Sequence, residues 1–207
     1  MARGIIVAKP GGGSGNGRIA VTDGVGDQSG RVATAIDAGT AVIFVEETKS
    51  VIGDIVDFSY DGKSATGITT FAKGAVINGP YADNITVGKG ESILISGGNV
   101  EGKITVNGGI LVVAGSSFIA GKIEAPVADS CVIVADSSTI EGKLEVSSAS
   151  TMAVRNSTIE GKIASSGNIY ASVTDTTVRG KLEVLNAKVC KCSGNTVQGQ
   201  TNTPGCA

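Results

Sequence analysis

The chain has 207 residues, enough for one large domain or two small ones, and a net charge of −2 that offers no basic surface to phosphate backbones or anionic lipid. Nucleic acid is therefore not expected as a main partner. The absence of His excludes Ser-His and Cys-His nucleophile pairs and every His-containing zinc site, so catalysis would have to depend on carboxylates, Lys or Tyr.

The composition favours an all-β fold. Gly is abundant at 31 residues, β-branched residues and Ser are common, and aromatic residues are scarce at 3%. Such a mixture favours strands and tight corners over helices. The first ten residues lack the apolar stretch of a secretory signal, and no run approaches the ~20 apolar residues that span a bilayer. We expect a chain made in the cytoplasm, without a signal peptide or a membrane span.

Residues 1–70 are predicted to form a small β-barrel that acts as an attachment module. Turn-rich pieces separate short strands. The predicted strands are Gly4–Lys9, Arg18–Thr22, Arg31–Ile36, Ala41–Glu46, Asp54–Tyr60 and Ser64–Thr69.

This segment resembles a cold-shock-type OB barrel. The stretch from Ile52 to Ile68 looks like the last two strands of that family, and the segment Val42–Val45 stands where the family has an aromatic nucleic-acid strand. The resemblance implies an OB-like fold. The binding function does not carry over, because Arg18–Val21 offers no aromatic platform and only Phe44 remains on the second strand.

Residues 71–207 are predicted to form a parallel β-helix of about six coils with a C-terminal capping tail. A glycine-centred motif recurs at spacings of 19, 21, 19, 19 and 19 residues, and a fainter copy precedes it by 23. So short a period indicates a solenoid, and its alternating triplets leave no room for a helix. Each glycine is expected at a corner that needs a positive φ or has no room for a Cβ. The corner glycines are Gly79, Gly102, Gly121, Gly142, Gly161, Gly180 and Gly199.

The repeat also predicts which side chains stack inside the solenoid, because equivalent residues of successive coils lie ~4.8 Å apart. One column contains Ile104, Ile123, Leu144, Ile163 and Leu182. A second contains Val100, Ile119, Ile140, Ile159 and Val178. A third contains Ile95, Val113, Val134, Val154, Val173 and Cys192.

Charged residues are predicted to form two outward columns. Their simpler interpretation is a solvated face whose opposite charges offset each other, and the alternative is a docking stripe for a complementary partner. The candidate stripe consists of Lys103, Lys122, Lys143, Lys162, Lys181, Glu124, Glu145 and Glu183.

The repeats resemble those of bactofilins, the bacterial cytoskeletal β-helix family, whose coils carry the same Val-x-Gly-x-Ile corner followed by alternating apolar triplets. The resemblance covers about residues 76–200. It implies a filament-forming scaffold. Bactofilins usually have short disordered tails, whereas this chain has about 70 residues in front of its repeats.

A phosphate-loop spacing, a glycine-rich run and two carboxylates match functional motifs only in part. Gly97–Lys103 has phosphate-loop spacing, but Ile104 replaces the Mg²⁺-binding hydroxyl residue and no helix follows. The glycine-rich run at 11–17 also lacks a following helix and is interpreted as a hairpin loop. Asp136 and Asp175 are the only outward carboxylates of comparable register, and they lie two coils apart. No catalytic residue and no cofactor is expected.

The cysteines leave three alternatives open. Cys190, Cys192 and Cys206 could offer thiolates to a soft metal ion. The register favours buried thiols for Cys190 and Cys192, with a disulfide to Cys206 as the second alternative and a metal site as the third. The fourth cysteine is Cys131.

We therefore expect a non-enzymatic structural protein, a rigid stalk, spike or decoration element of a larger assembly such as a phage or virus particle. Its expected partners are other protein subunits, including copies of itself, and the hypothesis places it on the virion. A bactofilin-like scaffold predicts filaments instead. A carbohydrate-binding or carbohydrate-active β-helix, the third hypothesis, predicts a groove with carboxylates and aromatic residues.

Overall fold

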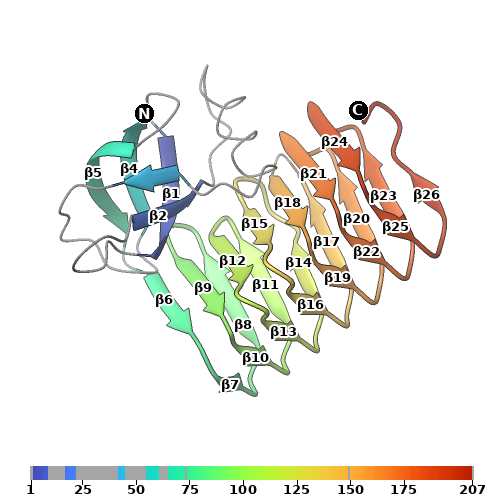
Figure 1. Ribbon diagram of the computed structural model, residues 1–207, viewed down its shortest axis with the longest axis horizontal. Helices are drawn as coiled ribbons and strands as arrows, with labels where there is room; N and C mark the ends of the chain where they lie inside the picture. Colours follow the sequence, from blue (N-terminus) through green and yellow to red (C-terminus); the bar gives the residue numbers. More distant parts are fainter. Residues whose placement is uncertain are drawn as a thin grey trace.

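The computed structural model describes residues 2–8, 17–21, 42–44, 55–60, 65–72, 74–148 and 150–206. Every regular element among them is a β-strand, as the composition predicted. The strands form three parallel sheets of seven strands and one antiparallel sheet of five (Figure 1). None of these residues belongs to a helix that could cross a membrane.

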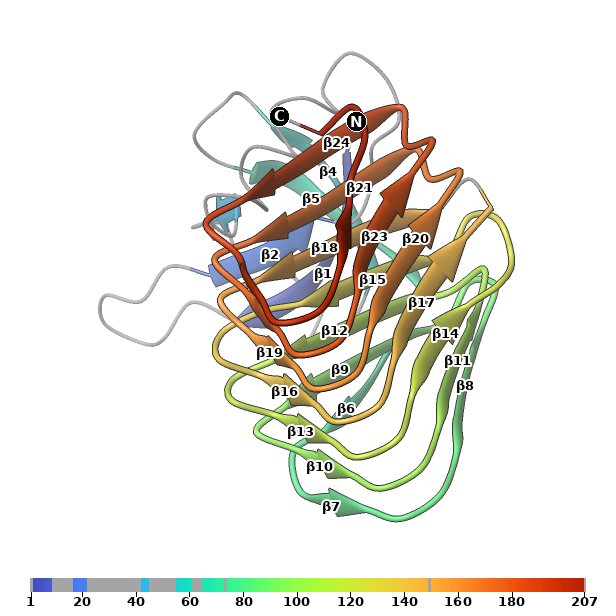
Figure 2. The same ribbon diagram turned by 90° about the vertical axis from the view of Figure 1, so that its right-hand side faces the viewer.

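Residues 74–202 wind into a parallel β-solenoid of seven coils, each with one strand in each of three sheets (Figures 1 and 2). Sheet 1 contains β6 (Gly74–Ile77), β9 (Ser92–Ser96), β12 (Ile110–Ala114), β15 (Cys131–Val134), β18 (Thr151–Arg155), β21 (Tyr170–Thr174) and β24 (Val189–Ser193). Sheet 2 contains β7 (Pro80–Tyr81), β10 (Asn99–Val100), β13 (Phe118–Ile119), β16 (Thr139–Ile140), β19 (Thr158–Ile159), β22 (Thr177–Val178) and β25 (Thr196–Val197). Sheet 3 contains β8 (Ile85–Gly88), β11 (Ile104–Asn107), β14 (Ile123–Ala125), β17 (Leu144–Ser147), β20 (Ile163–Ser166), β23 (Leu182–Leu185) and β26 (Thr201–Asn202). The prediction of about six coils falls one short, because the fainter copy around Gly79 forms a complete first coil.

The strand register confirms all three predicted inward columns. Ile123 pairs with Ile104 and Leu144, Ile140 pairs with Ile119, and Val134 pairs with Val113. Each column also extends into the first coil, through Ile85, Tyr81 and Ile77 respectively. From the second coil to the sixth, the inward aliphatic side chains other than the partly buried Ile93 are at most 1% exposed and form one continuous core. Each coil therefore buries its apolar face only because a neighbouring coil lies against it.

The repeated glycines stand where coils approach each other too closely for a side chain. None of the six repeat glycines from Gly102 to Gly199 has a positive φ. A Cβ on any of them would collide with the backbone of the preceding coil. At Gly142 this Cβ would lie 2.5 Å from the carbonyl oxygen of Gly121. Gly79 has no atom within 4 Å of its Cβ position, because its coil has no predecessor. Of the two expected explanations, lack of space is the correct one.

The left-handed residues lie at the other two corners of the coil. The corner between sheets 1 and 2 uses Gly97, Ser116, Ser137, Asn156, Asp175 and Gly194, with φ between 44° and 68°. The corner between sheets 3 and 1 uses Gly90, Gly108, Asp129, Ser148, Gly167 and Asn186, with φ between 53° and 78°. Small polar residues tolerate this conformation better than β-branched ones, so these corners need no fixed residue type and leave no obvious repeat in the sequence.

Between its two end strands, sheet 1 is largely buried on both faces. Its outward side chains Leu94, Val112, Ile133 and Ala153 are at most 4% exposed and belong to a second apolar cluster. Strand β1 contacts β9, and the five-stranded sheet lies beside the first coils (Figure 1). Strands covered on both faces carry continuous apolar runs, and β12 and β15 do so, whereas the strands of sheet 3 alternate.

The N-terminal strands form an antiparallel sheet in the order β3-β2-β1-β4-β5, and its edge strands β3 and β5 contact each other. Five of the six predicted strands overlap these elements, and Arg31–Ile36 lies outside the described residues. Val56 and Phe58 of the fourth strand are fully buried. The OB-like barrel stays a prediction. The strands are β1 (Ala2–Ala8), β2 (Gly17–Val21), β3 (Val42–Phe44), β4 (Ile55–Tyr60) and β5 (Ala65–Ala72).

Candidate functional site

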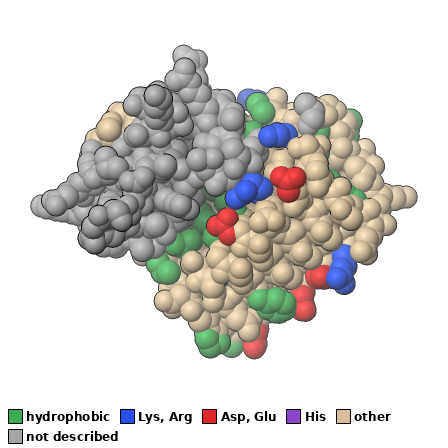
Figure 3. Space-filling model, in the orientation of Figure 1, with side chains coloured by type: hydrophobic (Ala, Val, Ile, Leu, Met, Phe, Trp, Pro, Cys, Tyr) green, Lys and Arg blue, Asp and Glu red, His purple; other side chains and the backbone are tan. Residues whose placement is uncertain are grey.

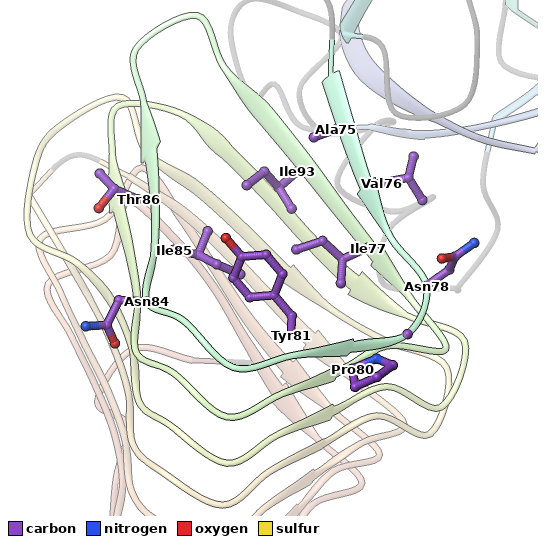
Figure 4. A pocket seen from close by; sticks show the side chains of 11 residues that line it. Ala75, Val76, Ile77, Asn78, Pro80, Tyr81, Asn84, Ile85, Thr86 and Ile93 are labelled. Atoms are coloured by element: carbon purple, nitrogen blue, oxygen red, sulfur yellow. The ribbon is translucent and has the colours of Figure 1, made fainter.

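The first coil leaves one end of the solenoid open. β6, β7 and β8 are edge strands of the three sheets, so no further coil among the described residues pairs with them. Residues of this coil, together with Ile93 of the second coil, line a hollow of about 520 Å³. Figure 4 shows Ile77, Ile85 and Ile93 within this opening, with the ring of Tyr81 lying across it. Tyr81 is 38% exposed and Val76 is 42% exposed, so this end presents apolar surface to solvent.

The C-terminal tail is tied to the last coil. After β26 in sheet 3 the chain returns to sheet 1, where Cys206 forms a disulfide with Cys190 of β24, with a Cα–Cα distance of 4.6 Å. Figure 2 shows this tail passing across the coil end between β26 and β24. β25 and β26 belong to the last coil, so among the described residues only 203–206 follow it, and their role as a capping tail stays a prediction. The two ends of the solenoid thus differ, because a disulfide ties a tail to the last coil and none is present at the first among the described residues.

The structure corrects the interpretation of Cys190 as a buried thiol. The C-terminal tail brings Cys206 next to Cys190, and the two residues form a disulfide, which was the second alternative. Cys192 keeps a free thiol below Val173, as the third column predicted. Burial raises the pKa of the Cys192 thiol to about 11. Cys131 is not part of a disulfide and lies buried on the outward face of β15.

The candidate docking stripe is present on sheet 3, but its charges pair with one another. Glu124 forms ion pairs with Lys103 and Lys122, the second at 2.6 Å. Lys162 pairs with Glu145 at 2.7 Å, and Lys181 pairs with Glu183. Lys143 stands in the same column, where its charge helps to lower the pKa of Glu145.

These pairs shift the carboxyl groups in one direction. Hydrogen bonds from Lys103 and Lys122 hold the pKa of Glu124 below its ordinary value. The hydrogen bond from Lys162 does the same for the pKa of Glu145. Figure 3 shows acidic and basic side chains interspersed on one face, without a large single-sign patch over its described residues. This pairing favours the solvated-face interpretation, and a docking role for the stripe stays a prediction.

The phosphate-loop segment has no free backbone N–H cradle. The amide of Gly98 donates to Ser117 Oγ at 3.2 Å, and that of Lys103 donates to Asn84 Oδ1 at 2.8 Å. The amides of Asn99 and Glu101 donate to carbonyl oxygens of the first coil. The segment is β10 with its two corners, as its recurrence in every coil indicated. Most of the glycine-rich run at 11–17 lies outside the described residues.

The two outward carboxylates are corner residues. Asp136 and Asp175 both have left-handed backbones, with φ of 57° and 49°. Arg155 of the next coil pairs with Asp136 at 3.3 Å. Both acids therefore have a place in the fold as corner residues of the coil.

Two features of the structure were not predicted from the sequence. The buried outward face of sheet 1 has a readable signal, the unbroken apolar runs 93–95, 110–113 and 131–134 where other strands alternate. The open first coil also has a signal, since Tyr81 replaces an aliphatic residue in its column and a terminal coil differs from internal ones. No family model matches this sequence, and the searches of curated proteins and of solved structures found no match either.

Proposed function

We propose that this chain is a non-catalytic structural protein, a rigid β-solenoid rod that serves as a stalk, spike or decoration element of a larger assembly such as a phage or virus particle. The observation that carries the proposal is the uninterrupted stack of aliphatic columns through the solenoid. Seven coils at ~4.8 Å give a rod of roughly 30 Å. Such a stack resists bending, because any bend must open contacts between coils.

The two unlike ends support a finite assembly of copies of this chain. The open first coil offers unpaired strand edges and exposed apolar side chains, which favour pairing with another chain. At the other end, the disulfide ties the tail to β24 of the last coil. If two open ends meet, the contact is self-complementary and closes as a dimer, whereas growth into a fibre needs two adhesive ends.

Light scattering coupled to size-exclusion chromatography, with negative-stain microscopy, tests this proposal on the oxidised chain. We expect discrete oligomers with a mass that is a multiple of 20.5 kDa. Tyr81→Asp places a charge in the open end and should give monomers, while Val189→Asp, at a residue of the last coil that is 54% exposed, should leave the oligomer unchanged. Circular dichroism of both variants checks that the fold is kept.

Monomers of the unmodified chain at all concentrations, or equal effects of the two variants, would contradict the proposed interface. Long salt-resistant filaments would favour the second candidate, a bactofilin-like scaffold. The observation behind that candidate is that β24, β25 and β26 are also edge strands of the three sheets. Filaments that form only after reduction would show that the tail blocks this second end.

A further inference from the structure

Three of the four cysteines in this chain meet at the last coil. Cys190 and Cys192 lie two residues apart on β24, so both point to the same side of the strand. They pair in register with Ala171 and Val173, which belong to the solenoid core. Cys206 reaches them from the tail. The three sulfur atoms all lie within 4.8 Å of one another.

A disulfide by itself accounts for only two of these residues. In the coils below, the same two columns contain hydrocarbon side chains and one thioether, from Ile93 to Ala171 and from Ile95 to Val173. Thiols replace them only in the coil that the tail reaches. Cys192 therefore adds a third sulfur at the one place where the fold already brings two together.

We propose that, once its disulfide is reduced, the chain binds one thiophilic metal ion, Cu(I) or Zn(II), through the thiolates of Cys190, Cys192 and Cys206. An all-sulfur set selects such soft ions over Mg²⁺ or Ca²⁺. Three thiolates complete a trigonal Cu(I) site, and Zn(II) would add a water molecule as its fourth ligand. Zn–S bonds of about 2.3 Å place sulfur atoms about 3.8 Å apart. After reduction, the sulfurs of Cys190 and Cys206, about 2 Å apart in a disulfide, must separate by nearly 2 Å, while the Cys192 sulfur must approach them by no more than about 1 Å.

A dithiol can supply the electrons and protons that reduce the disulfide before the metal ion binds. The dithiol transfers two electrons and two protons to the sulfurs of Cys190 and Cys206, the bond between them breaks, and the dithiol closes into its own disulfide. The ion then displaces the three thiol protons, which are released to solvent. Because Cys206 belongs to the tail, the bound ion holds the tail to β24 as the disulfide did.

Metal titration of the full chain tests the site. The protein is reduced with dithiothreitol, freed of it without air, and titrated with Zn(II) or with Cu(I) against chromogenic chelators. We expect one ion per reduced chain and none at this site in the oxidised chain. Cys192→Ala should weaken binding at least about tenfold, while the matched control Cys131→Ala, in β15, should not.

Two results would overturn the proposal: no stoichiometric binding of either ion by the reduced chain, or equal affinity of the Cys192→Ala variant and the unmodified chain. Circular dichroism of the oxidised variants shows whether they fold, since the Cys190–Cys206 bond is kept in both. The chelator competition also shows which of the two ions binds more tightly.

Amide hydrogen exchange over residues 201–206 gives a second readout. Exchange should be slow in the oxidised chain, fast after reduction, and slow again with one ion bound. Exchange that stays fast at saturating metal would show that Cys206 is not a ligand and would refute the three-thiolate site.

Discussion

Replacing Gly142 by Ala tests the close approach between coils. The added Cβ would lie 2.5 Å from the carbonyl oxygen of Gly121 and 2.6 Å from the amide nitrogen of Lys122. Both are backbone atoms of the preceding coil, which no rotamer change can move. Ordinary contacts begin at 3.4 Å, so the two coils must separate by about 0.9 Å.

The separation would break the backbone pairing beside this corner. The hydrogen bonds from Glu141 N to Ile119 O and from Ile123 N to Lys143 O are both 2.9 Å long. Lengthening them by about 0.9 Å takes both beyond hydrogen-bonding distance. Overpacking costs about 1–3 kcal/mol and each lost hydrogen bond about 1 kcal/mol, so we expect the free energy of unfolding to fall by about 3–5 kcal/mol. The melting temperature should fall by roughly 10 °C.

Gly79→Ala is the matched control, because its coil has no predecessor and no atom lies within 4 Å of the Cβ position. Both substitutions reduce the freedom of the unfolded chain equally, so the difference between them reports the collision. Urea unfolding followed by circular dichroism measures both. Stabilities of the Gly142→Ala and Gly79→Ala variants that agree within about 0.5 kcal/mol would refute the explanation by lack of space.

Further substitutions test the corners, the core and the charged columns. Ser137→Gly relieves a φ of 61° and should raise the free energy of unfolding by about 1 kcal/mol. Ser138→Ala removes a 2.7 Å hydrogen bond from a buried hydroxyl to the partly buried carbonyl of Ala135 and should lower that free energy by about 1–3 kcal/mol; urea titration checks the opposite signs. Ile140→Ala, at a fully buried position, should cost about 3 kcal/mol in the same assay, while Val127→Ala, at a position 46% exposed, should cost less than about 0.5 kcal/mol. Because lysine pairing lowers the pKa of Glu124, its stabilisation is complete above the ordinary value of 4.5 and is lost as the pH falls through the lower folded value. Glu124→Gln should therefore reduce the acid dependence of stability, by at most about 1 kcal/mol, and an unchanged slope in melting temperature between pH 5 and pH 2 would contradict this role.

The corner glycines show how much of the fold can be predicted from the repeat. Spacing alone identified Gly102 and its equivalents, and from them the inward columns through Ile104, Val100 and Ile95. The spacing did not distinguish a left-handed corner from one with no space for a Cβ, because both favour glycine. The first coil was also undercounted, since Gly79 has no coil below it and its surroundings are under different constraints.

The pairing of the cysteines could not be predicted from the repeat. Register correctly placed Cys192 in a core column and Cys190 below Ala171. Whether Cys206 returns to either of them depends on the path of a tail that shares no period with the coils. The observed disulfide could only be left as one of several alternatives.

The repeat is enough to predict the solenoid, its register and its core, because in a stacked repeat each residue's neighbours are its own equivalents one period away. Tertiary structure alone decided the rest: the tail tied to the last coil, the open first coil, and the covered outward face of sheet 1. These depend on contacts between segments with no common period, such as β1 with β9 and Cys206 with Cys190. Only the folded path of the chain brings such segments together.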